Sequence, residues 1–176
     1  MRYSFELPRR RRANVWLDEV PPAEFTPASK ITRLIKPKVV VPAVRRVAAL
    51  EMNIPHGPMA SYALLGAELV EAPADGLEVV VFVNSAGALF APSLALRSDE
   101  TRVGLPEEYA GAVIAGVQWV ANSSGVPTNV TVRFRWAAHG LAGSSRWALE
   151  EVSRIVMRLL ALPRGVSEKQ IEALFG

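Results

Sequence analysis

Apolar and polar side chains alternate along residues 129–136, which read NVTVRFRW. In a strand, alternate side chains point to opposite faces, so this pattern predicts a half-buried strand with one solvated face. The apolar side chains of that strand would be Val130, Val132, Phe134 and Trp136, and the polar ones Thr131, Arg133 and Arg135.

In residues 103–120, VGLPEEYAGAVIAGVQWV, apolar side chains instead recur every three to four positions, which predicts a helix over about 106–121. Pro106 fits the first helical position, and the two glutamates that follow it favour the positive end of the helix dipole. Tyr109, Val113, Val117 and Val120 recur at helical spacing and define the buried face. Gly116 lowers helix propensity by about 1 kcal/mol relative to Ala, which we expect close packing on a sheet to offset.

A second helix is predicted over about 145–161, with Ser144 or Ser145 as its N-cap. Glu150 and Arg154 are spaced to form an ion pair along it. Its predicted inner face comprises Trp147, Val152, Ile155, Val156 and Leu159. Ser167 and Gln170 then have the spacing of a capping box, which predicts a short C-terminal helix within residues 163–176.

Three further strands are predicted at 63–72, 77–83 and 89–97, separated by turns at 72–76 and 84–87. From residue 63 the expected order is therefore β-β-β-α-β-α. Amphipathic helices that follow such strands would cover one face of a mixed sheet. The predicted fold class of residues 63–162 is an α+β two-layer sandwich.

Residues 1–58 contain eight of the 13 prolines. Because proline lacks an N–H and fixes φ, this density predicts an extended arm with short helical pieces rather than strands of a central sheet. One helical piece is expected from Pro42 to about Glu51. Residues 38–41, KVVV, could add a strand to the edge of a sheet.

Charge divides the chain in the same way. Residues 1–50 carry 11 Lys or Arg against 4 Asp or Glu, whereas residues 51–176 carry 9 against 13. The basic arm is expected to meet a polyanion or an acidic protein surface, or else to contact the acidic domain of its own chain or of a neighbouring copy.

The chain has no Cys, which excludes disulfides, thiolate zinc sites and a Cys nucleophile. It has no apolar run of 18 residues and no apolar segment after its first charges, so we expect a cytoplasmic protein without a membrane span.

The element order and the motif GLPEEYAGAVIAGV resemble domain IV of the elongation factor G family, as do NVTVRFRW and GSSRWAL at residues 143–149. The likeness covers about residues 63–162 and implies a left-handed βαβ crossover. It also places His139 in a loop that carries a histidine at the domain tip in that family, where the domain reaches the decoding region of the small ribosomal subunit. No Walker loop is present, so the resemblance implies the fold without the GTPase.

Three groups of residues are candidate binding sites. The run Arg9, Arg10, Arg11 and Arg12 could neutralise phosphates of a nucleic acid, or could be a solvated or protein-docking segment. Arg133 and Arg135 share a strand face with the same potential, although such faces are commonly just solvated. Gly143, Ser144 and Ser145 precede a helix N-terminus that could hold an anion, or could simply cap it.

No constellation in the sequence indicates catalysis. The two histidines have no carboxylate at ligand spacing, His139 has no evident acid to orient it towards a serine, and no glycine fingerprint marks a nucleotide site. The sequence therefore predicts a non-enzymatic binding protein without a metal or cofactor, whose partner is structured RNA or a ribosome. The alternative is a structural subunit of a homo- or hetero-oligomeric assembly, in which residues 1–58 dock on a neighbour.

Overall fold

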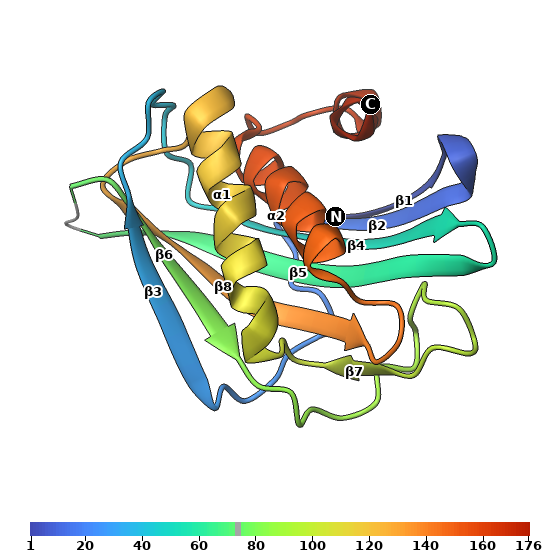
Figure 1. Ribbon diagram of the computed structural model, residues 1–176. Helices are drawn as coiled ribbons and strands as arrows, with labels where there is room; N and C mark the ends of the chain where they lie inside the picture. The colour runs from blue at the N-terminus through green and yellow to red at the C-terminus, as the bar shows by residue number, and fades with distance from the viewer. Residues whose placement is uncertain (73–74) are drawn as a thin grey trace.

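The computed structural model describes residues 1–72 and 75–176 and contains one eight-stranded mixed sheet beneath a layer of helices (Figure 1). The strands are β1 (Arg2–Leu7), β2 (Arg11–Leu17), β3 (Ser29–Ile35), β4 (Val47–His56), β5 (Met59–Glu71), β6 (Leu77–Val83), β7 (Thr101–Val103) and β8 (Val130–Gly140). The helices are α1 (Ala110–Ser123), α2 (Arg146–Ala161) and α3 (Glu168–Glu172), with single 3-10 turns at Pro8–Arg10, Glu107–Tyr109 and Ala173–Phe175.

The sheet order is β1-β2-β4-β5-β8-β6-β3, with β7 paired to β8. The chain passes from β6 through α1 to β8, and these two neighbouring strands run parallel. The other described strand pairs are antiparallel. The predicted α+β class with a mixed sheet is confirmed.

α1 and α2 lie side by side on one face of the sheet (Figure 1). Val113, Val117 and Val156 are fully buried between these helices and the sheet. The other face is partly covered by irregular chain, where Phe90 packs with Trp16 and Tyr62 in a smaller apolar cluster. The sheet is therefore buried on both faces near its centre, which a two-layer prediction does not anticipate.

Residues 1–58 are not an arm, because they form strands β1 to β4 of the same sheet. The prolines that suggested an arm lie mainly in connections: Pro8 and Pro58 in hairpin turns, Pro21, Pro22 and Pro27 between β2 and β3, and Pro37 and Pro42 between β3 and β4. Proline density here marks turns and not a lack of sheet structure. The helix expected from Pro42 to Glu51 is likewise wrong, since Val47–His56 is the buried strand β4.

Two other strand predictions change. Residues 89–97 are irregular, and the next strand is the short β7. The KVVV segment pairs inside its own chain, because Val40 forms a parallel bridge with Val126. The predicted turn at 72–76 falls partly on residues 73 and 74, which lie outside the described residues.

A β-bulge in β8 changes the face on which Trp136 lies. Phe134 pairs with Ala67 and Trp136 pairs with Gly66, so Arg135 is an extra residue on its strand. A bulge of this kind shifts the alternation of side chains by one position. Trp136 therefore leaves the apolar helix-covered face predicted for it, and Ala137 takes that face with Phe134.

The helices begin close to their predicted positions. Ser145 caps α2 by accepting a hydrogen bond from Ala148 N, and Ser167 and Gln170 form the expected capping box. Gly116 permits close contact with α2 and not with the sheet, since a Cβ there would lie 2.6 Å from Glu150 O. Trp147 is 56% exposed, so its predicted place on the inner face of α2 is wrong.

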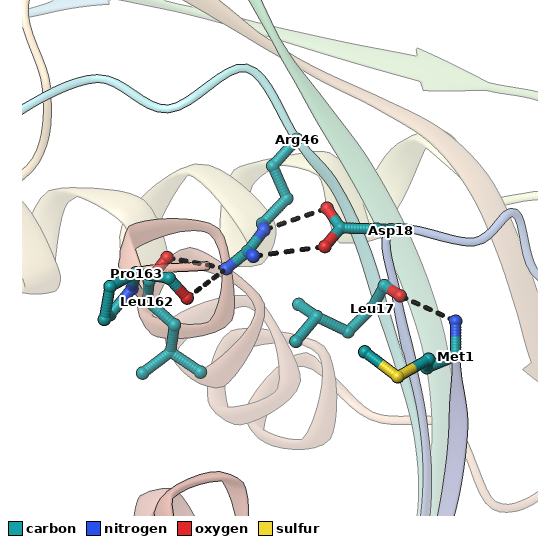
Figure 2. A network of polar contacts seen from close by, with 6 residues as sticks. All are labelled: Met1, Leu17, Asp18, Arg46, Leu162 and Pro163. Carbon is teal, nitrogen blue, oxygen red and sulfur yellow. Dashed lines mark hydrogen bonds and ion pairs between the residues drawn. The ribbon is translucent and has the colours of Figure 1, made fainter. Parts of the chain in front are cut away.

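Arg46 joins three parts of the fold at the start of β4 (Figure 2). Its side chain is 1% exposed, and its Nε and Nη2 donate to the carboxylate of Asp18 at 2.9 and 3.1 Å. Its Nη1 donates to Leu162 O, beyond the last turn of α2, at 2.6 Å. This guanidinium therefore ties the ends of β2 and α2 to β4.

None of the described helices is both long enough and apolar enough to cross a bilayer.

Candidate nucleic-acid interface

The arginine run forms the turn of the β1–β2 hairpin. Leu7 pairs with Arg11, which leaves Pro8, Arg9 and Arg10 as the connection. Arg9 and Arg10 have φ values of 62° and 59°, in the left-handed region that is uncommon for residues other than glycine. Both side chains are exposed. The hairpin thus holds two consecutive arginines in strained backbone at its tip.

The four arginines differ in their contacts. Arg11 Nη2 donates to Phe175 O at 3.1 Å, and Arg12 Nη2 donates to Leu94 O at 3.0 Å. These two side chains brace the hairpin against the C-terminal segment and the 84–100 segment. Over the described ranges, Arg9 and Arg10 have no such side-chain hydrogen bond, and no ion pair involves any of the four. Arg11 and Arg12 keep their charge, because a carbonyl is neutral, but Arg9 and Arg10 are the two arginines of the run whose donors are not already engaged within the described residues.

An exposed tryptophan lies beside this tip. A groove of about 490 Å³ separates the hairpin from α2, and both Arg9 and Trp147 line it. Its other walls include Pro8, Arg11, Ile54 and Phe175, and one acidic residue, Glu151. The groove therefore combines a cation with an exposed indole. The sequence did not reveal this pairing, because helical periodicity assigned Trp147 to the core.

Arg133 and Arg135 lie on the face of the sheet that α1 and α2 leave uncovered, and they do not join the hairpin site. Arg135 Nη1 bonds Glu68 Oε1 at 3.1 Å, and its guanidinium lies 5.8 Å from the centre of the Trp136 ring. Arg133 pairs across the strand with Glu68. The carboxylate of Glu68, which neighbours both arginines, would weaken their attraction to a phosphate backbone, and both side chains are exposed, as on a solvated face.

His139 is buried, with 3% of its surface exposed, and lies in strand β8, paired with Arg102 of β7, and not in a loop. Its Nδ1 lies 2.9 Å from Gly104 O. A hollow of about 420 Å³ next to it is lined by Ser85, Glu107 and Glu108. The histidine, which also lines this hollow, therefore does not sit in an exposed tip loop as the family resemblance implied.

The predicted anion loop is filled from within the chain. Ala142 N and Gly143 N donate to the two carboxylate oxygens of Asp99 at 2.8 and 2.9 Å. Ser144 Oγ donates to Tyr62 O at 2.6 Å, and Ser145 caps α2. Of the three predicted residues, only Gly143 contacts an anion, and that anion is the Asp99 side chain of this protein, whereas Ser144 and Ser145 bond elsewhere.

A buried polar cluster beneath the 84–100 segment was not predicted from the sequence. Glu51 is 1% exposed and accepts hydrogen bonds from Asn14 Nδ2, Tyr62 Oη and Leu94 N at 2.8, 2.9 and 2.8 Å. Burial, followed by the charge of Glu51, raises the pKa of Tyr62 far above its usual range. The cluster anchors the 84–100 segment to the sheet. Its residues come from β2, β4 and β5, so no local sequence pattern marks it.

Residues 1–72 and 75–176 contain no group of three His, Cys, Asp or Glu side chains placed to bind a metal ion.

Comparison of the chain with models of known protein families and with curated proteins gave no match. Function is therefore inferred from the chemistry of the sites themselves.

Proposed function

We propose that this protein is a non-enzymatic RNA-binding protein whose contact surface is the β1–β2 hairpin tip and the groove beside it. The observation that supports this proposal most strongly is the shared groove of Arg9 and Trp147. Proteins bind unpaired nucleotides by stacking bases on aromatic rings while cations meet the backbone. Arg9 and Arg10 supply the cations, and Trp147 supplies the ring.

The energies of these contacts suit a loop or single-stranded part of a structured RNA. Stacking of one base on an aromatic side chain contributes about 1–3 kcal/mol. Each phosphate that an arginine neutralises adds to the salt dependence of binding through release of counterions. Arginine also donates in a planar fork that matches two phosphate oxygens, which a lysine does not.

A ribosomal location in the cytoplasm remains part of the proposal through the resemblance to translation-factor domain IV. The connection from β6 to β8 supports it, since these two parallel neighbouring strands are joined through β7 and α1, and the GLPEEY motif at residues 104–109 leads directly into α1. We expect its crossover to be left-handed. Because His139 is buried, the RNA contact would be made by the hairpin and not by the tip loop.

The test is fluorescence anisotropy with a labelled stem-loop RNA at 50 to 300 mM salt. The double variant Arg9→Ala/Arg10→Ala should bind at least about tenfold more weakly and lower the slope of log Kd against log salt by about 1.4, for two contacts to unpaired nucleotides. Trp147→Ala should weaken binding about tenfold, with the slope unchanged. Arg133→Ala/Arg135→Ala is the matched control of equal charge loss and should bind like the parent. Equal weakening by both arginine pairs would show non-specific attraction and contradict the proposal.

A protein partner is the second candidate. Residues 1–58 belong to the chain's own sheet, so such a partner would meet a sheet edge and not a free arm. Strand β1, at one edge of the sheet, has side chains suited to such a partner, and that contact does not require RNA.

A further inference from the structure

Strand β1 is an edge of the sheet, paired on one side with β2 and with no described strand on the other. An open edge presents unpaired backbone N–H and C=O groups, which can pair with a strand of another chain. β1 contains no proline and no lysine that would block such pairing. The edge is thus available to a partner strand.

The hydrogen bonds of the N-terminus show which residues of β1 face this edge. Met1 N donates to Leu17 O and Leu17 N donates to Met1 O, both at 2.9 Å, so Met1 and Leu17 exchange two bonds. Bonded and non-bonded pairs alternate along antiparallel strands. Tyr3, Phe5 and Leu7 therefore bond to β2, and the N–H and C=O groups of Arg2, Ser4 and Glu6 point outward.

We propose that two copies of this chain associate through β1, antiparallel, about a two-fold axis at Ser4. In this register Arg2 of each copy lies opposite Glu6 of the other, and Ser4 lies opposite Ser4. These are the residues whose backbone groups point outward, so each of the three pairs exchanges two hydrogen bonds. The two charge pairs are complementary, which stabilises cross-strand neighbours.

The side chains of the β1–β1 contact are also complementary on the helix-covered face of the sheet. Tyr3 of one copy meets Phe5 of the other on the helix-covered face, where the two rings already stack within one chain with centres 6.3 Å apart. Cross-strand aromatic pairs stabilise sheets. A shift of two residues in register would remove both charge pairs, so the sequence of β1 specifies the axis at Ser4.

The opposite edge of the sheet lacks this self-complementarity. β3 reads SKITRLI and carries Lys30 and Arg33 but no acid. Lys36 and Lys38 follow it directly. Two copies paired through β3 would bring like charges together. Lysine residues on an edge strand commonly prevent such edge-to-edge pairing. The pairing is therefore assigned to β1 alone.

The dimer would place two RNA-binding hairpins on one continuous sheet. Arg9 lies five residues from the axis, so the two tips would be separated by roughly ten residues of strand, or about 33 Å. An RNA that reached both tips would bind with avidity. The dimer itself does not depend on RNA.

The test is sedimentation velocity of the full chain from 1 to 200 μM without nucleic acid. The parent should form a dimer. Arg2→Glu and Glu6→Arg should each weaken dimerisation at least tenfold, and Arg2→Glu/Glu6→Arg together should restore it. A chain that is monomeric at 200 μM, or single reversals that leave the dimer unchanged, would overturn the proposal.

Ser4→Pro tests the backbone contribution, because it removes an N–H that points outward and is not part of the β1–β2 ladder. It should abolish the dimer while circular dichroism shows a folded monomer. Should Ser4→Pro not fold, the charge exchange decides alone. Arg9→Ala/Arg10→Ala should dimerise normally, so loss of RNA binding and loss of dimerisation are distinguishable.

Discussion

Arg46 and Asp18 form a two-pronged ion pair in which the guanidinium is buried and the carboxylate is partly exposed, at 1% and 46% (Figure 2). Asp18 has a φ of 57°, a left-handed conformation that Asp and Asn tolerate better than other side chains. The pair therefore depends on the backbone at the end of β2 as well as on charge.

Removal of the carboxylate should destabilise the fold strongly, since it leaves a buried cation with only carbonyl partners. We expect Asp18→Ala to lower the free energy of unfolding in urea by about 3 kcal/mol. Asp18→Asn keeps the left-handed backbone and a neutral acceptor, and should cost less than half as much. Equal losses in the two variants would show that charge is not the cause.

Tyr62 should make stability fall at alkaline pH. Its pKa is raised in the folded state above the ordinary 10.0, chiefly by burial and then by Glu51, so the unfolded chain releases this proton first. The contribution is fully present below pH 10 and is lost as the pH rises further, by about 1.4 kcal/mol per pH unit. Urea unfolding between pH 9 and 11.5 should show this loss in the parent and a much smaller loss in Tyr62→Phe, which keeps Tyr109, a less buried tyrosine whose pKa is also raised, chiefly by burial. A parallel decline in both proteins would mean that another group is responsible.

Gly116 and Gly111 provide a matched pair on α1. Gly116→Ala would place Cβ 2.6 Å from Glu150 O and 2.8 Å from Ser153 Cβ, so the gain in helix propensity should be outweighed by the overlap. We expect a net loss of about 1–2 kcal/mol in thermal or urea unfolding. At Gly111 the nearest atom is the flexible end of Arg146, at 3.5 Å. Gly111→Ala should therefore stabilise the protein by up to about 1 kcal/mol.

The strain at the hairpin tip predicts opposite effects on stability and on binding. Arg9→Asn/Arg10→Gly introduces the residues that left-handed hairpin turns favour, and should raise the free energy of unfolding by about 1 kcal/mol. The same variant lacks both tip cations and should bind the stem-loop RNA as weakly as Arg9→Ala/Arg10→Ala. Retention of full RNA affinity would remove the tip from the proposed interface.

Asp99 should compete with external anions for the 140–145 loop. Asp99→Ala leaves two N–H groups to water, one exposed and one half-buried, and should lower stability by about 1 kcal/mol. Added sulfate should raise the melting temperature of this variant more than that of the parent, because the vacated donors can then bind sulfate. Glu100→Ala, which removes a neighbouring carboxylate bonded to Arg102, is the control. It should respond to sulfate as the parent does.

The helices and the alternating strands could be predicted because their signals are local. The caps of α2 and α3, and the buried positions Val113 and Val117, follow from spacing within one element. Trp147 shows the limit of this reasoning. It is an apolar residue at helical spacing, yet more than half of it is exposed, and a sequence pattern does not show which element lies opposite a side chain.

The N-terminal third was misassigned because the prediction used the number of prolines and not their positions relative to the strands. Prolines in β2–β3 and β3–β4 connections leave the strands between them intact. Glu51 could not be recognised as a buried anchor, since Asn14, Tyr62 and Leu94 come from distant parts of the chain. The hairpin charges were found from the sequence, whereas their neighbour Trp147 required the fold.

The extra residue in β8 places two consecutive side chains, Arg135 and Trp136, on the same face of the sheet. Without Arg135, Trp136 would directly follow Phe134, and regular alternation would keep Trp136 on the uncovered face and Ala137 beneath the helices. Substitution or deletion of this one codon should therefore leave the environment of each later position up to Gly140 unchanged. Close relatives of this protein are expected to vary in identity at position 135 and, in some cases, to lack this residue.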